Sequence, residues 1–422
     1  MPDVRLTGEP TQRAAFRVAF VHSFYSSEQP SGENTAVLDQ VAALRAAGHE
    51  VHMVAAHTDT LQAEFGYTMR SGLRVATGRG RSPLAELRRF APDIVHVHNL
   101  FPNFGTDWLE RWPGPLVATL HNYRPACAAG TLFRDGKVCA KCPEGDRWAA
   151  LRHACYRGSR RATLPLAWAT RGGAAAHPLL RRADKLIVLS EYSREFYRRF
   201  SNSGGRLELV PNFFDAVQVN SSERSIAGES EVGSPWVFAG RLSEEKGILP
   251  LLRSWPQNES LDVIGSGPLE SACRAAAPKK VKFLGGLPRA QLLGRLPHYT
   301  GLIFPSACPE NAPVICREAV AAGLPVLALS GSSAAQDVLR HGTGAVYSGT
   351  DELSQALDAA RETFPVLREH CFHVHASHFS APSWVMRVEK VYARAVEEAV
   401  ARQRGSVPGR HEGHAESIPP AD

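Results

Sequence analysis

The chain has 422 residues and a formal net charge of +6, and 44% of its residues are hydrophobic against 21% that are charged. This composition excludes a wholly disordered or collagen-like chain, and the length predicts two or three domains. No stretch approaches the ~18 consecutive apolar residues of a membrane-spanning helix. The N-terminus carries Asp3, Glu9 and Arg17 where a signal peptide needs an apolar core. We therefore expect a cytoplasmic protein.

The first 210 residues alternate short β-branched runs with helical patterns, which is typical of a parallel α/β sheet. The apolar runs predict strands at 16–21, 52–56, 73–76, 93–98, 115–121 and 184–190. Apolar residues at helical spacing predict helices over 34–49 and 191–200. We expect an N-terminal Rossmann-like domain over 14–210, with a cysteine-rich insertion at 122–160.

A polar stretch then interrupts the pattern, and 211–234 is interpreted as a linker. The alternation restarts, with strands predicted at 236–240, 261–265, 281–286, 301–305 and 325–329. The remaining chain is predicted to form a second Rossmann-like domain (235–380), an amphipathic helix (381–403) and a disordered tail (404–422). Two doubly wound domains should face a cleft, because ligands of such sheets bind outside the carboxyl ends of the strands.

Positive charge is concentrated between Arg147 and Lys185. This segment contains eight arginines and one lysine against the single acid Asp184, so it alone carries +8. Such a stripe suits the phosphates of lipids or nucleic acids, but a solvated arginine-rich helical face explains it equally well. Within it, the apolar run 164–169 (LPLAWA) lies between arginines, which is typical of a helix at a membrane surface.

Two segments of the second half carry candidate chemistry. In FAGRLSEEKGI (238–248), Gly240 allows close backbone approach, and Arg241 and Lys246 could bind a diphosphate near a helix start. In FPSACPENAPVICREAVAAGLPVLA (304–328), Glu310 is predicted in a loop and Glu318 on the following helix. Eight residues of helix span ~12 Å, so the two carboxylates need not be neighbours. We expect them to bind two separate parts of one elongated ligand. Taken alone, each segment is also compatible with solvated charges around ordinary connections.

In combination, the two segments resemble family-4 retaining glycosyltransferases of the GT-B fold. The family pattern G-R-x-x-x-x-K-G followed by P-S-x-x-x-E-x-x-P-x-x-x-x-E-A is met here by Gly240, Arg241, Lys246, Gly247, Pro305, Ser306, Glu310, Pro313, Glu318 and Ala319. The resemblance extends from about Phe16 to about Tyr392. It implies the GT-B fold, in which two Rossmann-like domains face a cleft and the C-terminal helix crosses back to the first domain.

The resemblance also implies a role for each matching residue. Arg241 and Lys246 would hold the donor's diphosphate, Glu318 the ribose hydroxyls and Glu310 the donor sugar. Backbone N–H groups of the loop Asn311, Ala312, Pro313 and Val314 would contact that sugar. The family often has glycine and an aromatic residue where this chain has Asn311 and Ala312, which leaves the identity of the sugar open.

The first half contributes further candidates. By resemblance, His121 faces the donor sugar, and the polar loop 26–37 corresponds to a glycine loop with Gly32, Glu33 and Asn34 that contacts phosphate or acceptor. A plain helix cap by Asn34 is an equally good interpretation. His96 and His98 point to one face of a strand, as metal ligands can, but the sequence offers no third ligand and the family uses this motif structurally.

Four cysteines of the insertion, Cys127, Cys139, Cys142 and Cys155, have a spacing that suits a structural zinc site. A subset of the family carries a similar pattern. Free or redox-labile thiols remain the alternative interpretation.

The function implied by the resemblance is a retaining hexosyl-type transfer from a UDP- or GDP-sugar to an acceptor hydroxyl. The chain has no Asp-x-Asp, so Arg241 and Lys246 would neutralise the leaving group without a metal or other cofactor, and the departing phosphate would accept the proton. We expect a lipid-linked or polysaccharide acceptor in envelope synthesis, peripheral attachment to the inner face of the membrane through 147–185, and no nucleic-acid partner. The alternatives are a nucleotide-sugar epimerase of the same fold and a zinc-containing nucleic-acid-binding module.

Overall fold

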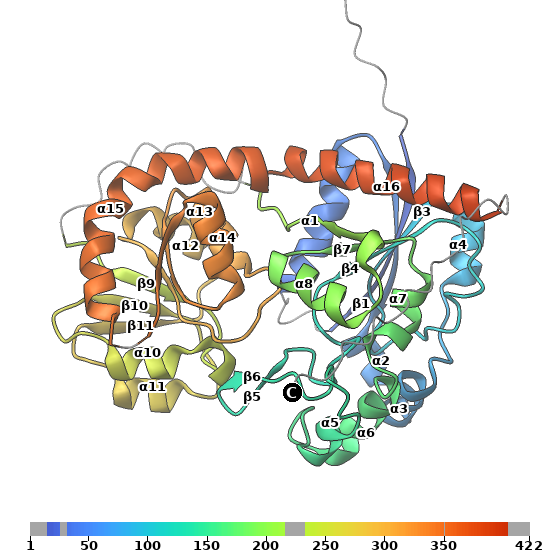
Figure 1. The fold of residues 1–422 in the computed structure, drawn as a ribbon, viewed down its shortest axis with the longest axis horizontal. Helices are drawn as coiled ribbons and strands as arrows, with labels where there is room; N and C mark the ends of the chain where they lie inside the picture. The colour runs from blue at the N-terminus through green and yellow to red at the C-terminus, as the bar shows by residue number, and fades with distance from the viewer. Residues whose placement is uncertain (1–14, 26–31, 216–232, 350, 404–422) are drawn as a thin grey trace, which may run out of the picture.

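The structure, a computed structural model, describes residues 15–25, 32–215, 233–349 and 351–403. These residues form two α/β domains that lie side by side, and a long C-terminal helix runs over the first of them (Figure 1). The central part of the predicted linker and the predicted tail over 404–422 lie outside the described residues. Within the described residues, no helix combines the length and the apolar composition needed to cross a bilayer.

The N-terminal domain is built on a six-stranded parallel sheet in the order β2-β1-β3-β4-β7-β8. The strands are β1 (Arg17–Phe24), β2 (Glu50–His57), β3 (Ile94–Asn99), β4 (Leu116–Leu120), β7 (Lys185–Val188) and β8 (Leu207–Leu209). The helices are α1 (Gly32–Ala46), α2 (Thr58–Gln62), α3 (Tyr67–Thr77), α4 (Leu84–Phe90), α5 (Ala149–Arg152), α6 (Arg160–Ala169), α7 (Pro178–Arg182) and α8 (Glu191–Phe200). Strand order reverses between β1 and β3, which is where doubly wound sheets bind their ligands.

The C-terminal domain repeats this plan with the order β11-β10-β9-β12-β13-β14, again all parallel. Its strands are β9 (Trp236–Ala239), β10 (Leu261–Ile264), β11 (Val281–Gly285), β12 (Leu302–Phe304), β13 (Val326–Leu329) and β14 (Gly344–Tyr347). Its helices are α10 (Ile248–Ser254), α11 (Glu270–Ala276), α12 (Arg289–Arg295), α13 (Val314–Ala321), α14 (Ser333–His341) and α15 (Leu353–Val374). The two domains therefore confirm the predicted GT-B architecture.

The last helix, α16 (Ala381–Gln403), belongs to the N-terminal core although it follows the C-terminal domain in sequence. Trp384, Val388 and Tyr392 are buried in one apolar cluster with Val18 and Phe20 of β1. The Tyr392 hydroxyl also hydrogen-bonds His96 Nδ1 at 2.8 Å inside that core. The predicted return of the C-terminal helix to the first domain is thus confirmed, and burial of its apolar face explains it.

The strand predicted at 73–76 is wrong, because these residues lie in α3. Gly66 and Gly78 flank this helix, both in the left-handed conformation with φ of 72°, and they set its two ends. The segment LRVA contains a single β-branched residue, Val75, and does not override a helix bounded in this way. The predicted helix over 191–200 coincides with α8, and the Ser190 side chain caps its N-terminus.

One prediction concerns the contact between α16 and the sheet. Replacing Tyr392 with Phe leaves a buried imidazole nitrogen of His96 without its partner, so we expect the free energy of unfolding to fall by about 1–3 kcal/mol. Chemical denaturation measures this change. Val400→Ala, at an exposed position of the same helix, is the control and should change stability by less than about 0.5 kcal/mol. Equal stability of Tyr392→Phe and wild type would contradict the importance of this bond.

Candidate active site

A cleft between the two domains brings together most of the predicted site residues. Its lining includes Gly32, Glu33, His121, Gly240, Arg241, Lys246, Glu310, Ala312, Pro313 and Val314. Leu189, Asn212, Ala239 and Ile315 also line it and were missed by the sequence analysis. Asn34, Asn311 and Glu318 are buried next to the cleft but do not line it. Residues 26–31 of the predicted glycine loop lie outside the described residues.

The two motifs of the C-terminal domain meet because Gly247 leaves room for a backbone. This residue has φ of +69°, and a Cβ atom there would lie 2.1 Å from the carbonyl oxygen of Pro305. The Ser306 hydroxyl then donates a hydrogen bond of 2.9 Å to the carbonyl oxygen of Glu245. The loop after β9 is therefore held against the loop after β12, and a side chain at 247 would separate them.

This contact places Lys246 beside Glu310. Lys246 Nζ donates a hydrogen bond of 2.7 Å to Glu310 Oε2, whereas the other carboxylate oxygen, Oε1, is buried without a partner. Lys246 ends a 3-10 turn over 244–246, and α10 begins two residues later at Ile248, so the lysine lies near a helix start as predicted. Arg241 is exposed and has no side-chain partner among the described residues. The cleft thus presents one paired and one unpaired cation.

Glu318 lies on α13 and is engaged at the domain boundary. Arg289 donates a hydrogen bond of 2.8 Å to Glu318 Oε1, and its guanidinium is also 3.8 Å from Asp39 of α1. Burial raises the pKa of the Glu318 carboxyl, and Arg289 opposes that shift. The second oxygen, Oε2, has no hydrogen-bond partner among the described residues, so one acceptor position of this carboxylate remains available.

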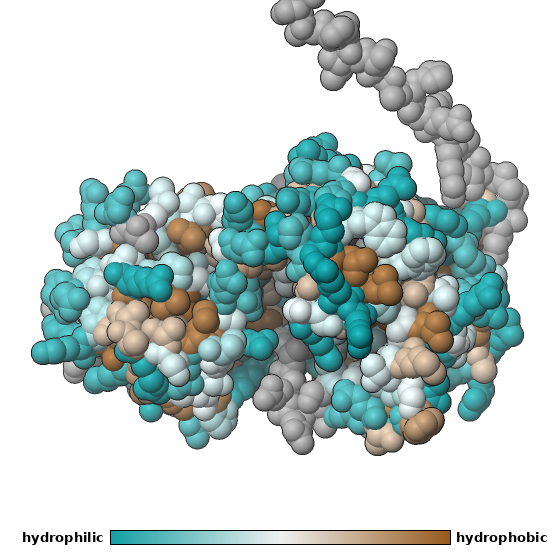
Figure 2. All heavy atoms as spheres, turned by 90° about the horizontal axis from the view of Figure 1, so that it is seen from below, coloured by the Kyte–Doolittle hydropathy of each residue, from teal (hydrophilic) through white to brown (hydrophobic). Residues whose placement is uncertain are grey.

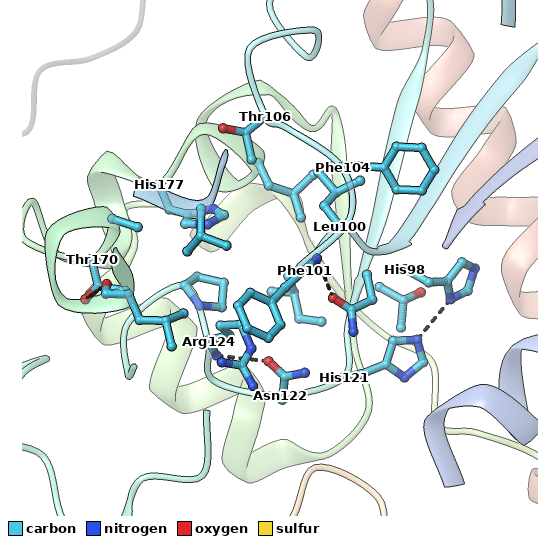
Figure 3. Close-up of a pocket in the computed structure, with 18 of the residues that line it drawn as sticks. His98, Leu100, Phe101, Phe104, Thr106, His121, Asn122, Arg124, Thr170 and His177 are labelled. Carbon is cyan, nitrogen blue, oxygen red and sulfur yellow. Dashed lines mark hydrogen bonds between the residues drawn. The ribbon is translucent and has the colours of Figure 1, made fainter. Parts of the chain in front are cut away.

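His121 follows β4 and is part of a cluster of histidines under the cleft. Its Nε2 shares a hydrogen bond of 2.9 Å with His98 Nδ1 (Figure 3). Burial lowers the pKa of His121 to about 3, so the ring is neutral at pH 7 and acts as a hydrogen-bonding group. His96 bonds Tyr392 and Thr119 instead, so both of its nitrogens are occupied within the core. The expectation that the His-x-His motif is structural therefore agrees with these contacts.

Glu33 is positioned by two asparagines that the sequence analysis did not connect with it. Asn99 donates a hydrogen bond of 2.7 Å to Glu33 Oε1, and Asn122 donates a longer one of 3.4 Å to Oε2. Asn34 does not cap a helix, because α1 already begins at Gly32; its side-chain oxygen bonds His22 Nε2 at 3.0 Å. The signal that could have revealed Asn99 and Asn122 is their position at the carboxyl ends of the adjacent strands β3 and β4.

Asn311, where the chain departs from the family, connects the two domains. Its side-chain amide donates a hydrogen bond of 2.9 Å to the carbonyl oxygen of Leu120, the residue before His121. Its Oδ1 is buried without a partner. A glycine at this position could not make this bond. Asn311 therefore fixes the Glu310 loop to the strand that carries His121.

The four cysteines Cys127, Cys139, Cys142 and Cys155 gather around one small cavity of the insertion. Burial raises the pKa of the Cys142 thiol to about 11 and also raises that of Cys155. Among the described residues, however, no group of three or more His, Cys, Asp or Glu side chains is arranged to hold a metal ion. The structural zinc site stays a prediction.

Both domains match known glycosyltransferase families. Residues 30–218 match the model described as Glycosyltransferase Family 4, and residues 235–362 match Glycosyl transferases group 1. The two matches together cover both Rossmann-like domains and most of the chain. The chain therefore carries the two domains of a GT-B glycosyltransferase of the group 1 type.

Two curated relatives align with part of the chain. It is 26% identical over 246 residues to an exopolysaccharide phosphotransferase of Streptomyces coelicolor, covering 53% of this chain and 25% of that protein. It is 28% identical over 196 residues to a GDP-mannose-dependent α-(1-6)-phosphatidylinositol monomannoside mannosyltransferase of Mycolicibacterium smegmatis, covering 40% of this chain and 50% of that protein. The alignments thus span a quarter and a half of these relatives.

Solved structures show the same fold at low sequence identity. Sucrose-phosphate synthase from Thermosynechococcus elongatus superposes with a TM-score of 0.63 at 17% identity, covering 90% of this chain and 99% of that one. HepE of Anabaena, in complex with UDP and glucose, gives a TM-score of 0.54 at 15% identity, with coverage of 90% and 99%. This similarity supports the GT-B fold of the chain.

The buried histidines predict a stability that depends on pH. Burial lowers the pKa of His22 to about 4 and those of His96 and His121 to about 3, so below pH 6.5 the unfolded chain binds protons that the folded protein does not. We expect the free energy of unfolding at pH 5.5 to be lower than at pH 7.5, by about 1 kcal/mol for each such histidine. Denaturant titrations at the two pH values measure this difference.

His22→Asn tests the assignment, because it should reduce the pH dependence by the share of one histidine. The exposed His373 provides the control, and His373→Asn should leave the dependence as in wild type. If His22→Asn also leaves it unchanged, the buried histidines are not its source.

Proposed function

We propose that the protein is a retaining glycosyltransferase that moves a glycosyl unit from a UDP- or GDP-sugar to an acceptor hydroxyl. The observation that carries this proposal is the cleft, in which Arg241, Lys246 and Glu310 of one domain face Glu33 and His121 of the other. HepE, whose structure contains UDP and glucose, and the mannosyltransferase described as GDP-mannose-dependent support the class of donor.

The charges of the cleft suit a nucleotide diphosphate. As the bond between the sugar and the diphosphate breaks, negative charge accumulates on the leaving phosphate, and cations already in place there lower the barrier. Arg241 is unpaired, and Lys246 has two further N–H groups besides the one that it gives to Glu310. The unpartnered Oε1 of Glu310 is then available to a hydroxyl of the donor sugar, and Oε2 of Glu318 to a ribose hydroxyl.

We propose a same-face substitution. The bond from the anomeric carbon to the diphosphate oxygen breaks, the acceptor oxygen bonds to the same face, and its proton passes to the departing phosphate oxygen. Neutral His121 contributes a hydrogen bond to the donor sugar rather than a charge. A product with inverted anomeric configuration, read by the NMR coupling of its anomeric proton, would contradict this mechanism. Activity that a chelator abolishes and Mn²⁺ restores would contradict its independence of metals.

The first test concerns the donor. We expect one class among UDP-, GDP- and ADP-sugars to raise the melting temperature, because ligand binding to the folded state stabilises it by mass action. Lys246→Ala and Arg241→Ala should each weaken binding of the bare nucleoside diphosphate at least tenfold, since each removes a phosphate contact. The exposed Lys282 of β11 lies outside the cleft lining, and Lys282→Ala is the control. Absence of stabilisation by every nucleotide, or equal affinity of all variants, would overturn the proposal.

We further propose that the acceptor is lipid-linked or polymeric, as in envelope polysaccharide synthesis, and that the enzyme docks on an anionic membrane. The helices α3 and α6 pack against each other, and together with the turn before α3 they expose five large apolar side chains, here called the α3–α6 surface. These are Phe65, Met69, Leu73, Leu164 and Trp168, with exposed fractions from 45% to 100%. Figure 2 shows apolar side chains among polar ones on this lower side of the N-terminal domain.

Arginines surround the α3–α6 surface. Arg70 lies on α3, Arg160 and Arg161 begin α6, and Arg171 follows it. Exposed apolar residues together with arginines suit insertion at the boundary between headgroups and acyl chains of an anionic bilayer. The segment 147–185, which is predicted to contact the membrane, supplies only the α6 side of the α3–α6 surface. The other side comes from α3.

The second test measures membrane binding. We expect vesicles with anionic lipid to sediment the wild-type protein at low salt, and we expect Leu73→Asp with Trp168→Asp to reduce the bound fraction at least fivefold. Leu339→Asp is the matched control, because Leu339 is 70% exposed in the C-terminal domain. Binding that is independent of lipid charge, or equal for both proteins, would contradict the proposed surface.

A further inference from the structure

A second cavity lies within the N-terminal domain, directly beside the interdomain cleft (Figure 3). It is bounded by the ends of β3 and β4 and by the helices α3 and α6. His121 lines both this cavity and the cleft. A ligand in the cavity would therefore lie next to the position proposed for the donor sugar. We call it the β3–α6 cavity.

The walls of the β3–α6 cavity are mainly apolar. Leu100, Phe101 and Phe104 follow β3, Leu166 projects from α6, and Leu179 projects from α7. Phe101 is visible at the centre of the cavity in Figure 3, with Arg124 beside it. Apolar walls with a few converging polar groups are typical of a binding site for a small molecule.

Four nitrogens at the cavity are buried without a hydrogen-bond partner. They are Nε of Arg74, Nε of Arg124, Nδ1 of His177 and Nε2 of His98. A buried polar group that lacks a partner destabilises the folded state. The four groups around one cavity therefore indicate a polar ligand, and the two arginine Nε–H groups can only donate to it.

The two guanidinium groups are held in place but are not neutralised. Arg124 Nη1 donates a hydrogen bond of 3.1 Å to the carbonyl oxygen of Ala128, and its guanidinium stacks 4.1 Å above the Phe101 ring. Arg74 Nη1 donates a hydrogen bond of 3.1 Å to the carbonyl oxygen of Pro102. Neither has an ion-pair partner in the part of the chain that the structure describes. Each keeps N–H groups of fixed direction, which suits a phosphate.

We propose that the β3–α6 cavity binds the acceptor by a phosphate or diphosphate ester carried on an apolar, prenyl-like chain. Arg74 and Arg124 bind the phosphate, and the apolar walls bind the first part of the chain. This inference rests on the proposed glycosyl transfer and narrows its acceptor to an anionic lipid.

The position of the cavity relative to the α3–α6 surface supports this acceptor. Arg74 and Val75 of α3 and Leu166 of α6 line the cavity, whereas Leu73 and Trp168 of the same helices are exposed. A lipid bound through its phosphate would thus be separated from the docked membrane only by the two helices that contact it. The sugar that the phosphate carries would lie beside His121, where the transfer is proposed.

The test compares three probes: farnesyl diphosphate, farnesol and inorganic pyrophosphate. Calorimetry is carried out on full-length protein with Arg241→Ala and Lys246→Ala, so that the donor site does not compete for phosphate. We expect farnesyl diphosphate to bind at least tenfold more tightly than either other probe, because only it supplies both the charge and the apolar chain. Arg124→Met should weaken its binding at least tenfold, and Arg124→Lys less, because Lys keeps the charge without the planar fork.

Two further variants separate the cavity from general effects. Ala169→Phe should fill the cavity and abolish binding without removing a charge. Arg111→Met removes an exposed arginine elsewhere in the N-terminal domain and should bind as the parent protein does. Pyrophosphate or farnesol binding as well as the complete probe would overturn the inference, and so would binding that survives both Arg124→Met and Ala169→Phe.

The outcome is distinguishable from failure of the proposed function. Stabilisation by a nucleotide in the wild-type protein tests the donor site and does not depend on the cavity. If nucleotides stabilise the protein but the lipid probe does not bind, the enzyme takes another acceptor. If the probe binds but no nucleotide does, the cavity is a lipid-binding site and the proposed function as a glycosyltransferase is wrong.

Discussion

Lys246 reaches Glu310 because residue 247 is a glycine, so no side chain separates its backbone from the carbonyl group of Pro305. A Cβ atom at residue 247 would lie 2.1 Å from the carbonyl oxygen of Pro305, which is far shorter than a van der Waals contact. Only glycine therefore allows the two loops to meet. The Ser306 hydroxyl fastens the contact by its bond to the Glu245 carbonyl. Without this packing, the cation and the carboxylate of the C-terminal half would face solvent on separate loops, and the cleft would have no anion site opposite His121.

The N-terminal half contributes to the site mainly by positioning neutral side chains, rather than by supplying charged ones. His22, His96 and His121 are neutral because burial makes their protonation costly, and the hydrogen bond between His98 and His121 sets the orientation of the His121 ring. The bond from Asn311 to the Leu120 carbonyl then ties this strand to the Glu310 loop. Arg289 makes a second connection, because it contacts Glu318 of one domain and Asp39 of the other. Polar bonds of this kind can break and reform, so the domain contact can adjust to a ligand.

Much of the fold could be predicted from the sequence because buried strands and amphipathic helices have distinct periods. The predicted strands of the second half all lie in its sheet, and the helix over 381–403 is observed with the same bounds. The strand at 73–76 was wrong because its helix depends on left-handed glycines at both ends, a signal that is weaker than an apolar run. The edge strands β8 and β14 were not predicted.

Site residues could be predicted from the sequence where they belong to one local motif. They could not be predicted where they pair with a residue from a distant segment. Gly240, Arg241, Lys246 and Glu310 line the cleft as a group, because two local motifs position them. The partners that hold them, such as Arg289 for Glu318 and Asn99 for Glu33, are separated by tens of residues. Spacing along the chain contains no information on such pairs. The β3–α6 cavity was missed for the same reason, because its four unpartnered nitrogens come from separate parts of the N-terminal domain.

The central claim is that a nucleotide diphosphate binds Lys246 through the N–H groups that its bond to Glu310 leaves free. A double-mutant cycle with Lys246→Met and Glu310→Gln, read as the calorimetric affinity for the nucleoside diphosphate, tests it most directly. The account predicts that Glu310→Gln binds this nucleotide at least as tightly as wild type, because the carboxylate that shares Lys246 with the diphosphate loses its negative charge. It also predicts that Lys246→Met weakens binding, and that Glu310→Gln no longer improves it in the absence of the lysine. Independent effects of the two substitutions, or no effect of Lys246→Met, would contradict the account.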